Sequence, residues 1–241
     1  MELYNSLIRK IPGLTGASAP VSSPYDPARC WDENAEFELI MQRDAAFELG
    51  GSGRPSANFT CVTSDETLVP RDEVTVIGPD LPALKADSPF ARLVLLQTGP
   101  GVEPDPQDSE ACFRAIQELD FIKYKIYPKG YMIRSSSESN REQVRIEKAA
   151  LKKGMSFSRI GNAMIRRYKA NPNVLRVHLY FITAPDADYA ALQKCASQVH
   201  DITMTLSKIL EGMPTDCHSC SMKPLCDEVE GMRELHFGKS K

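Results

Sequence analysis

Three cysteines lie close together near the carboxyl end of the chain, in a polar segment. Cys217 and Cys220 are separated by two residues, and Cys226 follows after five more. A Cys-x2-Cys pair can hold one iron or zinc ion from a single turn, while Pro224 stiffens the loop that carries the third sulfur. Three clustered thiolates need a cation, an iron-sulfur cluster or a disulfide to neutralise them. We therefore predict a metal site, with a disulfide or unused thiols as alternatives.

His236 supplies a candidate fourth ligand to this segment. Three thiolates and one imidazole match the Cys3His set of structural zinc, which would stiffen a tail with little core of its own. Thiolate-rich ligation equally suits a 4Fe-4S cluster, whose fourth iron could bind the histidine or a residue of another subunit. We favour iron-sulfur and keep zinc as the alternative; Cys195 and His200, on the predicted last helix, are weaker candidates for the fourth position.

The composition is that of a packed globular protein. The chain has 241 residues, of which 42% are hydrophobic, and its net charge of -3 argues against general nucleic-acid binding. The amino terminus has neither the charge nor the apolar run of a signal peptide, and no window is apolar enough to span a membrane. We expect a cytoplasmic protein in which Cys30, Cys61, Cys112 and Cys195 are core or half-buried thiols.

Periodicity of the apolar residues predicts the elements that must position these groups. Alternation or short apolar runs predict strands at residues 37–41, 74–77, 92–96 and 174–183, with His178 facing a polar sheet surface or making a core hydrogen bond. Helices are predicted over residues 3–11, 108–119, 156–169 and from Asp186 or Asp188 to about 209. Residues 122–126 and 131–133 resemble a hairpin, the serine run at 135–140 a solvated loop, and residues 144–154 a strand end that passes into a short helix ended by Gly154. Strands and helices in mixed order predict an α+β fold.

Three segments divide the chain. Residues 1–35 carry closely spaced glycines and prolines, which predict an irregular arm over the domain with Trp31 as its anchor. Residues 36–212 form the predicted α+β domain, and residues 213–241 form the Cys-rich tail. The glycine cluster at residues 50–53 lacks the spacing of a P-loop or dinucleotide motif and is expected to be a flexible turn. No catalytic residue is specific enough to name.

The stretches DEVTVIGPDL at residues 72–81 and VRIEKAALKKG at residues 144–154 occur in order with the terminal cysteines. Together they resemble acetyl-CoA synthase, the beta subunit of the carbon monoxide dehydrogenase/acetyl-CoA synthase complex, from about Phe37 to Cys226. The resemblance implies an α+β middle domain that helps to bind coenzyme A. It also implies the start of a last domain in which a nickel-containing cluster joins a methyl group, carbon monoxide and coenzyme A.

The chain departs from the family pattern at the cysteines. The family spaces its four cluster ligands as Cys-x2-Cys-x8-Cys-x9-Cys. Here only five residues separate the second and third cysteines, and His236 follows Cys226 after nine intervening residues. The chain ends at Lys241 without the later Cys-Gly-Cys that holds the nickel pair, and the family's amino-terminal Rossmann-like region is not recognisable. We therefore expect that this chain alone does not complete acetyl-CoA synthesis.

With this resemblance, the densest group of basic residues becomes a candidate site for coenzyme A or another phosphorylated ligand, because phosphates bind cationic side chains. A solvated helix face explains the same charges equally well. The group consists of Arg145, Lys148, Lys152, Lys153, Arg159, Arg166 and Arg167.

Two functions remain open at this point. The first is an acetyl-CoA-synthase-like accessory protein of anaerobic one-carbon metabolism, with an iron-sulfur cluster and with carbon monoxide dehydrogenase or corrinoid protein subunits as partners. The second is a non-catalytic interaction module stapled by zinc.

Overall fold

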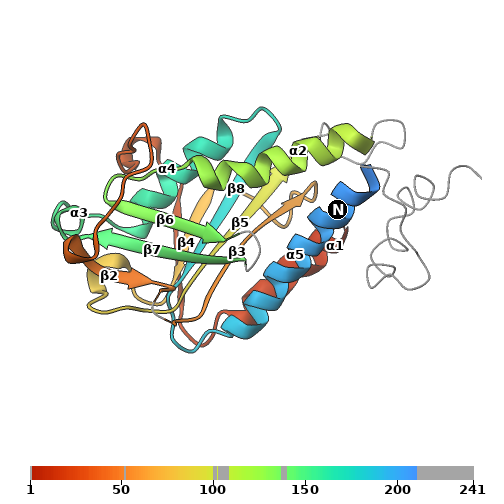
Figure 1. Cartoon of the computed structure of the whole chain (residues 1–241). Helices are drawn as coiled ribbons and strands as arrows, with labels where there is room; N and C mark the ends of the chain where they lie inside the picture. The colour runs from red at the N-terminus through yellow and green to blue at the C-terminus, as the bar shows by residue number, and fades with distance from the viewer. Residues whose placement is uncertain (1, 52, 100–101, 103–108, 137–139, 211–241) are drawn as a thin grey trace, which may run out of the picture.

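The computed structural model of the chain contains two β-sheets that are covered by helices (Figure 1). The structure describes residues 2–51, 53–99, 102, 109–136 and 140–210. The larger sheet has five strands in the order β1-β4-β8-β5-β3, and the smaller has three in the order β2-β7-β6. The strands are β1 Pro20–Pro24, β2 Ala45–Leu49, β3 Ser56–Thr63, β4 Glu73–Ile77, β5 Phe90–Thr98, β6 Tyr131–Ser136, β7 Arg141–Glu147 and β8 Val174–Ile182.

The five-stranded sheet mixes parallel and antiparallel pairs. β4 runs parallel to β8 and β3 runs parallel to β5, while β5 and β8 at the centre pair antiparallel. Every residue of β3 and β5 is buried, as expected for strands that are covered on both faces, although β3 is the last strand of this sheet. The predicted strands at 74–77, 92–96 and 174–183 are confirmed as parts of β4, β5 and β8, and so is the α+β class.

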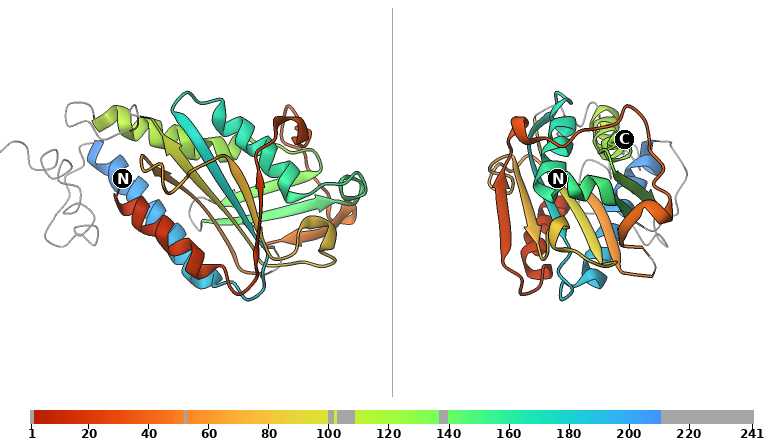
Figure 2. Two further views of the ribbon diagram at one scale, coloured as in Figure 1. Left: turned by 180° about the vertical axis from the view of Figure 1, so that it is seen from behind. Right: turned by 90° about the vertical axis from the view of Figure 1, so that its left-hand side faces the viewer.

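The helices cover the larger sheet from opposite sides, as the views in Figure 2 show. Gly161 of α4 (Phe157–Lys169) sits against Val74 and Phe181 on one face. On the other face, α1 (Glu2–Lys10) and α5 (Tyr189–Leu210) pack on β3, where the Thr63 hydroxyl donates to the Asn5 side chain at 2.6 Å. The smaller sheet lies beside α4, while α2 (Ser109–Phe121) packs against α5. No helix among the described residues is long and apolar enough to cross a membrane.

Local capping fixes several of the predicted boundaries. The Ser156 hydroxyl accepts the Arg159 N–H and begins α4, and the Asp188 carboxylate accepts the Ala191 N–H at 2.9 Å near the start of α5. The short helix α3 (Lys148–Lys152) follows β7 directly and is succeeded by Gly154 at a φ of +81°, as predicted.

Three local predictions were wrong. Residues 37–41 form no strand although their apolar side chains alternate, because the segment lies outside both sheets, and Phe37, Leu39 and Met41 are exposed. Residues 122–125 extend α2 as a 3-10 turn, held in part by the Lys123–Asp120 ion pair at 2.8 Å. β6 therefore pairs with β7, and the serine run contributes its first two members to β6 rather than to a loop.

The amino-terminal arm is more regular than its prolines suggested. β1 pairs antiparallel with β4 along its whole length, so the arm supplies an edge strand of the larger sheet. Pro20 and Pro24 are compatible with this position because an edge strand leaves one row of its backbone groups without a ladder partner.

A basic groove around Trp31 as the candidate functional site

The Trp31 side chain fixes the arm to the end of the molecule that carries α3. Its indole N–H donates to the Lys129 carbonyl at 2.7 Å, and its backbone N–H donates to the Arg159 carbonyl at 2.9 Å. The Arg159 guanidinium lies 4.5 Å from the centre of the indole ring, a cation-π arrangement. Only 6% of Trp31 is exposed, so its predicted role as the anchor of the arm is confirmed.

Two adjoining hollows flank this anchor and share Trp31, Asp32 and Lys129. The smaller has a volume of about 150 Å³ and the larger, which is more open, about 600 Å³. We call the pair the Trp31 groove. The smaller hollow is further lined by Glu147, Ala150, Lys153 and Arg159, and the larger by Cys30, Glu33, Asn34, Ala35, Arg166 and Arg167.

A carboxylate of the arm holds two arginines in the larger hollow. One oxygen of Glu33 accepts from Arg167 at 2.9 Å and from Arg166 at 3.3 Å, and both arginine side chains remain about half exposed. The other oxygen of Glu33 is buried and has no hydrogen-bond partner among the described residues. Glu33 thus presents its carboxylate where an anionic ligand of the two guanidinium groups would sit.

The rim of the smaller hollow is held by α3 and by the turn before β6. Arg159 donates to the Gly154 carbonyl at 3.2 Å, which ties the start of α4 to the end of α3. Gly130 has a φ of +74°, and a Cβ there would lie 2.6 Å from the Cβ of Ala150, so the turn that carries Lys129 requires glycine. Each hollow collects three cations and two carboxylates, which leaves one net positive charge in each.

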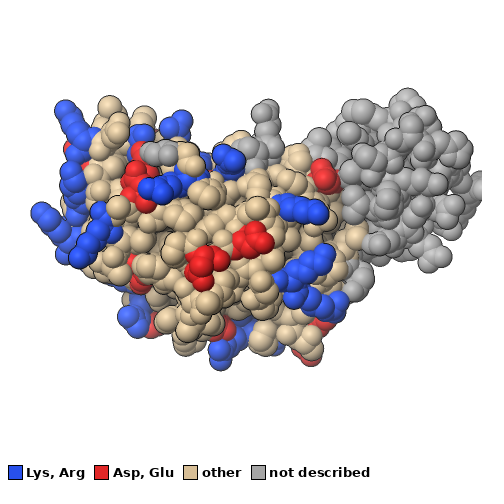
Figure 3. All heavy atoms as spheres, turned by 90° about the horizontal axis from the view of Figure 1, so that it is seen from below, with Lys and Arg blue, Asp and Glu red and all other residues tan. Residues whose placement is uncertain are grey.

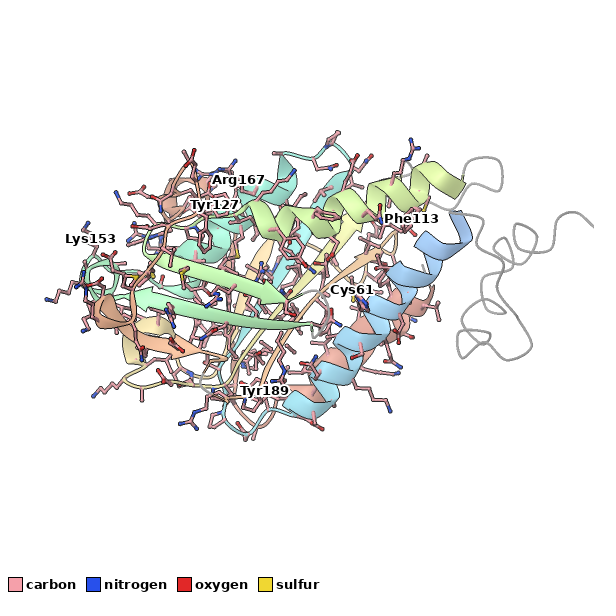
Figure 4. All side chains as sticks on the ribbon, viewed as in Figure 1. Cys61, Phe113, Tyr127, Lys153, Arg167 and Tyr189 are labelled. Carbon is pink, nitrogen blue, oxygen red and sulfur yellow. The ribbon has the colours of Figure 1, made fainter. Side chains whose placement is uncertain are left out.

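The structure brings together four of the seven predicted basic residues, namely Lys153, Arg159, Arg166 and Arg167 (Figure 4 labels Lys153 and Arg167). Three others do not line the groove. Arg145 is paired with Glu48 at 2.5 Å, Lys148 donates to the Arg43 carbonyl at 3.2 Å, and Lys152 is exposed on α3. Figure 3, which looks at another face, shows that lysine and arginine also gather at the α3 end, on the left.

Lys129, Asp32 and Glu33 were missed as groove residues. Lys129 stands alone between Pro128 and Gly130, and nothing in the local sequence links it to the arm. The contact depends on a backbone pairing in which the Lys129 N–H donates to the Asp32 carbonyl at 2.8 Å.

The predicted metal ligands Cys217, Cys220, Cys226 and His236 lie outside the described residues, as does the whole predicted tail. Within the described part of the chain, no group of three His, Cys, Asp or Glu side chains could hold a metal ion. Cys61, Cys112 and Cys195 are buried free thiols and Cys30 is half-buried, which confirms the prediction for these four. Burial raises the pKa of the Cys195 thiol, an unfavourable setting for a thiolate ligand.

His178 lies on the sheet face opposite α4 and joins two polar neighbours. Its Nε2 is 2.8 Å from the Thr75 hydroxyl, which is in turn 2.8 Å from the hydroxyl of Ser22. Burial lowers the pKa of His178 to about 4, so the imidazole is neutral at pH 7. The side chain therefore takes part in a hydrogen bond on a polar part of the sheet, as predicted.

Fold and groove together define an α+β domain with a mixed central sheet and a cationic groove at one end. Residues 32–187 match the family described as the CO dehydrogenase/acetyl-CoA synthase complex beta subunit, and the chain belongs to that family. The match covers all strands from β2 to β8 and every residue of the Trp31 groove except Cys30 and Trp31 itself. It confirms the resemblance seen in the two sequence stretches. No curated protein matches the chain.

Proposed function

We propose that this acetyl-CoA-synthase-like protein of one-carbon metabolism binds coenzyme A, or a ligand with the same phosphate groups, in the Trp31 groove. The family is named for a subunit of a complex, so a role beside other subunits of that kind is the natural setting. Carbon monoxide dehydrogenase and corrinoid protein subunits are the partners that we propose.

The observation that carries this proposal is the pairing of Arg166 and Arg167 on a single carboxylate in an open hollow. Phosphate oxygens accept the same charge-assisted hydrogen bonds as a carboxylate, and arginine forks bind them well. In the proposed complex a phosphate replaces Glu33 at the two guanidinium groups. Lys153 and Arg159 of the smaller hollow, with Lys129 between the hollows, would hold a second phosphate group of the same ligand.

A titration with coenzyme A, dephospho-coenzyme A and pantetheine tests this proposal. Trp31 is the single tryptophan of the chain, so its fluorescence reports on the groove beside calorimetry. Replacing both Arg166 and Arg167 by Gln should raise the dissociation constant for coenzyme A by about tenfold or more, the value of one or two lost charged hydrogen bonds.

Lys194→Gln is the matched control, because Lys194 is exposed on α5, away from the groove. It should leave the dissociation constant unchanged. Equal binding of pantetheine and coenzyme A, or binding that the double arginine variant does not weaken, would count against a phosphate site in the groove.

For the carboxyl-terminal segment we propose an iron-sulfur cluster held by Cys217, Cys220 and Cys226, with His236 as the candidate fourth ligand. Such a cluster would supply electron transfer or metal handling rather than complete acetyl-CoA synthesis. The chemistry of the donor set supports it, since three thiolates and an imidazole suit iron as well as zinc. The competing function, a zinc-stapled interaction module, is favoured by the same donors.

Metal and sulfide analysis with EPR, on protein purified without air, separates the two functions. Iron and sulfide that are lost in Cys220→Ser support the cluster, whereas stoichiometric zinc without sulfide, and unfolding on chelation, support the module. His236→Ala with unchanged metal content would show that the fourth ligand lies elsewhere.

A further inference from the structure

A fully buried ion pair lies between the two sheets. Arg92 of β5 and Glu142 of β7 meet in a bidentate arrangement, with Nε to Oε1 at 2.8 Å and Nη2 to Oε2 at 2.6 Å, and both side chains have no exposed surface. Glu142 also accepts from the Asn58 amide at 2.8 Å and from the Ser135 hydroxyl at 2.9 Å. The carboxylate is therefore satisfied by four hydrogen bonds from three elements.

The guanidinium group is not satisfied to the same degree. Arginine carries five N–H donors, and besides the two bonds to Glu142 the described residues offer Arg92 only the Met164 sulfur, at 3.8 Å. Two N–H groups of Arg92 are left over within the described part of the chain. Buried donors of this kind are rare unless a protein group or a water molecule accepts from them.

Polar atoms without partners gather around the same ion pair. The Oδ1 of Asn58, the Oγ1 of Thr60 and the hydroxyls of Tyr131 and Tyr168 are all buried without a hydrogen-bond partner among the described residues. Asn58 is the direct neighbour of Arg92 in the parallel β3–β5 register, and Thr60 follows on the same face of β3.

The two tyrosines come from different layers. Tyr131 belongs to β6 and Tyr168 to α4, and the charges of both Arg92 and Glu142 act on each hydroxyl. Burial raises the pKa of Tyr168, and Thr60 is near enough to offset part of that rise, although the two oxygens do not meet in hydrogen-bond geometry. Four polar atoms without a partner among the described residues, from two strands and one helix, thus lie around one ion pair.

The charge and protonation of these groups indicate what kind of molecule could bind among them. The ion pair has no net charge, and burial raises the pKa of both tyrosines, so the hydroxyls are neutral at pH 7. The two charges of the pair nearly cancel, so a buried ion would lose its hydration without gaining a net attraction. The partner that fits must be small, neutral, and able both to donate and to accept, as water is.

We propose that one or more internal water molecules bind at this cluster and bridge the unused Arg92 donors to the hydroxyls of Tyr131, Tyr168 and Thr60 and the Asn58 amide. The site joins both sheets and α4 in one hydrogen-bonded network. It lies in the protein interior and does not depend on what the Trp31 groove binds.

Removal of single hydroxyls tests the proposal through the sign of the stability change. If the two hydroxyls had no partner at all, Tyr168→Phe or Tyr131→Phe would leave the stability unchanged or raise it, because burying an unpaired hydroxyl is unfavourable. If each hydroxyl is instead hydrogen-bonded to an internal water molecule, its removal breaks that hydrogen bond. We expect each variant to lower the equilibrium constant for folding by about fivefold or more in urea titrations.

Tyr189→Phe calibrates the loss of a satisfied hydroxyl, because Tyr189 donates to the Ala184 carbonyl at 3.0 Å. Thr60→Val extends the test to the third hydroxyl, because valine has nearly the same shape as threonine but lacks the hydroxyl. A high-resolution crystal structure should show ordered water within hydrogen-bond distance of both tyrosine hydroxyls. Absence of that density, or phenylalanine variants at least as stable as the parent, would overturn the proposal.

Discussion

Neutralising Glu142 should be among the most damaging single changes in the protein. In Glu142→Gln the side chain keeps its shape and one acceptor oxygen, but the new amide group faces donors from Arg92, Asn58 or Ser135. Arg92 is then left as an unpaired charge with no exposed surface. The fold must tolerate this charge in its interior or open to hydrate it.

The size of the loss follows from the burial of both partners. Removing one member of a buried ion pair typically costs about 3–5 kcal/mol, against a total stability of roughly 5–15 kcal/mol for a protein domain. With a urea m-value of about 3 kcal/mol per M, this loss lowers the unfolding midpoint by about 1–1.7 M. Replacing both partners, as in Arg92→Met with Glu142→Leu, should cost less than the sum of the single changes, because no buried charge remains.

Urea titrations followed by circular dichroism measure these changes. Asp44→Asn serves as the control, since Asp44 pairs with Arg43 at 3.7 Å with both side chains mostly exposed and should change the free energy of unfolding by less than about 0.5 kcal/mol. If Glu142→Gln lost less than about 1 kcal/mol, the two side chains could not be desolvated as the structure shows, and the reasoning would fail.

Three further predictions address the groove, the core and pH. Glu33→Gln should raise the affinity for coenzyme A several-fold in calorimetry, because it weakens a carboxylate that competes for two arginines; unchanged or weaker binding would contradict this. Gly161→Ala should lower the free energy of unfolding by about 1–2 kcal/mol in urea, since the new Cβ would lie 2.5 Å from a Val74 methyl and overpacking outweighs the gain in helix propensity. The pKa of His178 is lowered to about 4, so the unfolded chain takes up the proton first and stability should fall as pH drops from 6.5 towards 4, by less than about 3 kcal/mol. A His178→Gln variant should lack this part of the pH dependence in titrations at fixed urea.

The sequence predicted the elements whose signal is local. β8 and α4 show clear apolar periodicity, and Ser156 marks the beginning of α4, so both were found with nearly correct bounds. Residues 37–41 show the same alternation and yet form no strand. Alternation indicates which side chains could lie on one face of a strand, but it does not indicate whether a neighbouring strand is available for pairing. β3 was missed since half of its residues are polar and yet all are buried. Asn58, for example, is buried because Glu142 of β7 and Ser135 of β6 accept hydrogen bonds from its amide.

The candidate site was predicted only in part, because the local sequence does not show which distant segments pair with each other. Positive charge clustered in residues 145–167 was visible in the sequence, but charge density alone could not separate Arg145, which neutralises Glu48, from Arg167, which lines an open hollow. Trp31 was recognisable as an anchor, whereas Lys129 and Glu33 enter the groove through a pairing of segments almost a hundred residues apart. The buried network around Arg92 had no sequence signal at all.

The elements outside the family match have a consequence for any attempt to isolate this domain. The matched range of residues 32–187 excludes α1, β1 and α5. A fragment cut to that range would expose the outer edge of β4 and the face of β3 that carries Phe59 and Cys61, both almost fully buried in the whole chain. Free strand edges and bare apolar faces drive aggregation. The segment that matches the family is therefore shorter than the segment that we expect to remain soluble. Expression trials should keep at least residues 2–210.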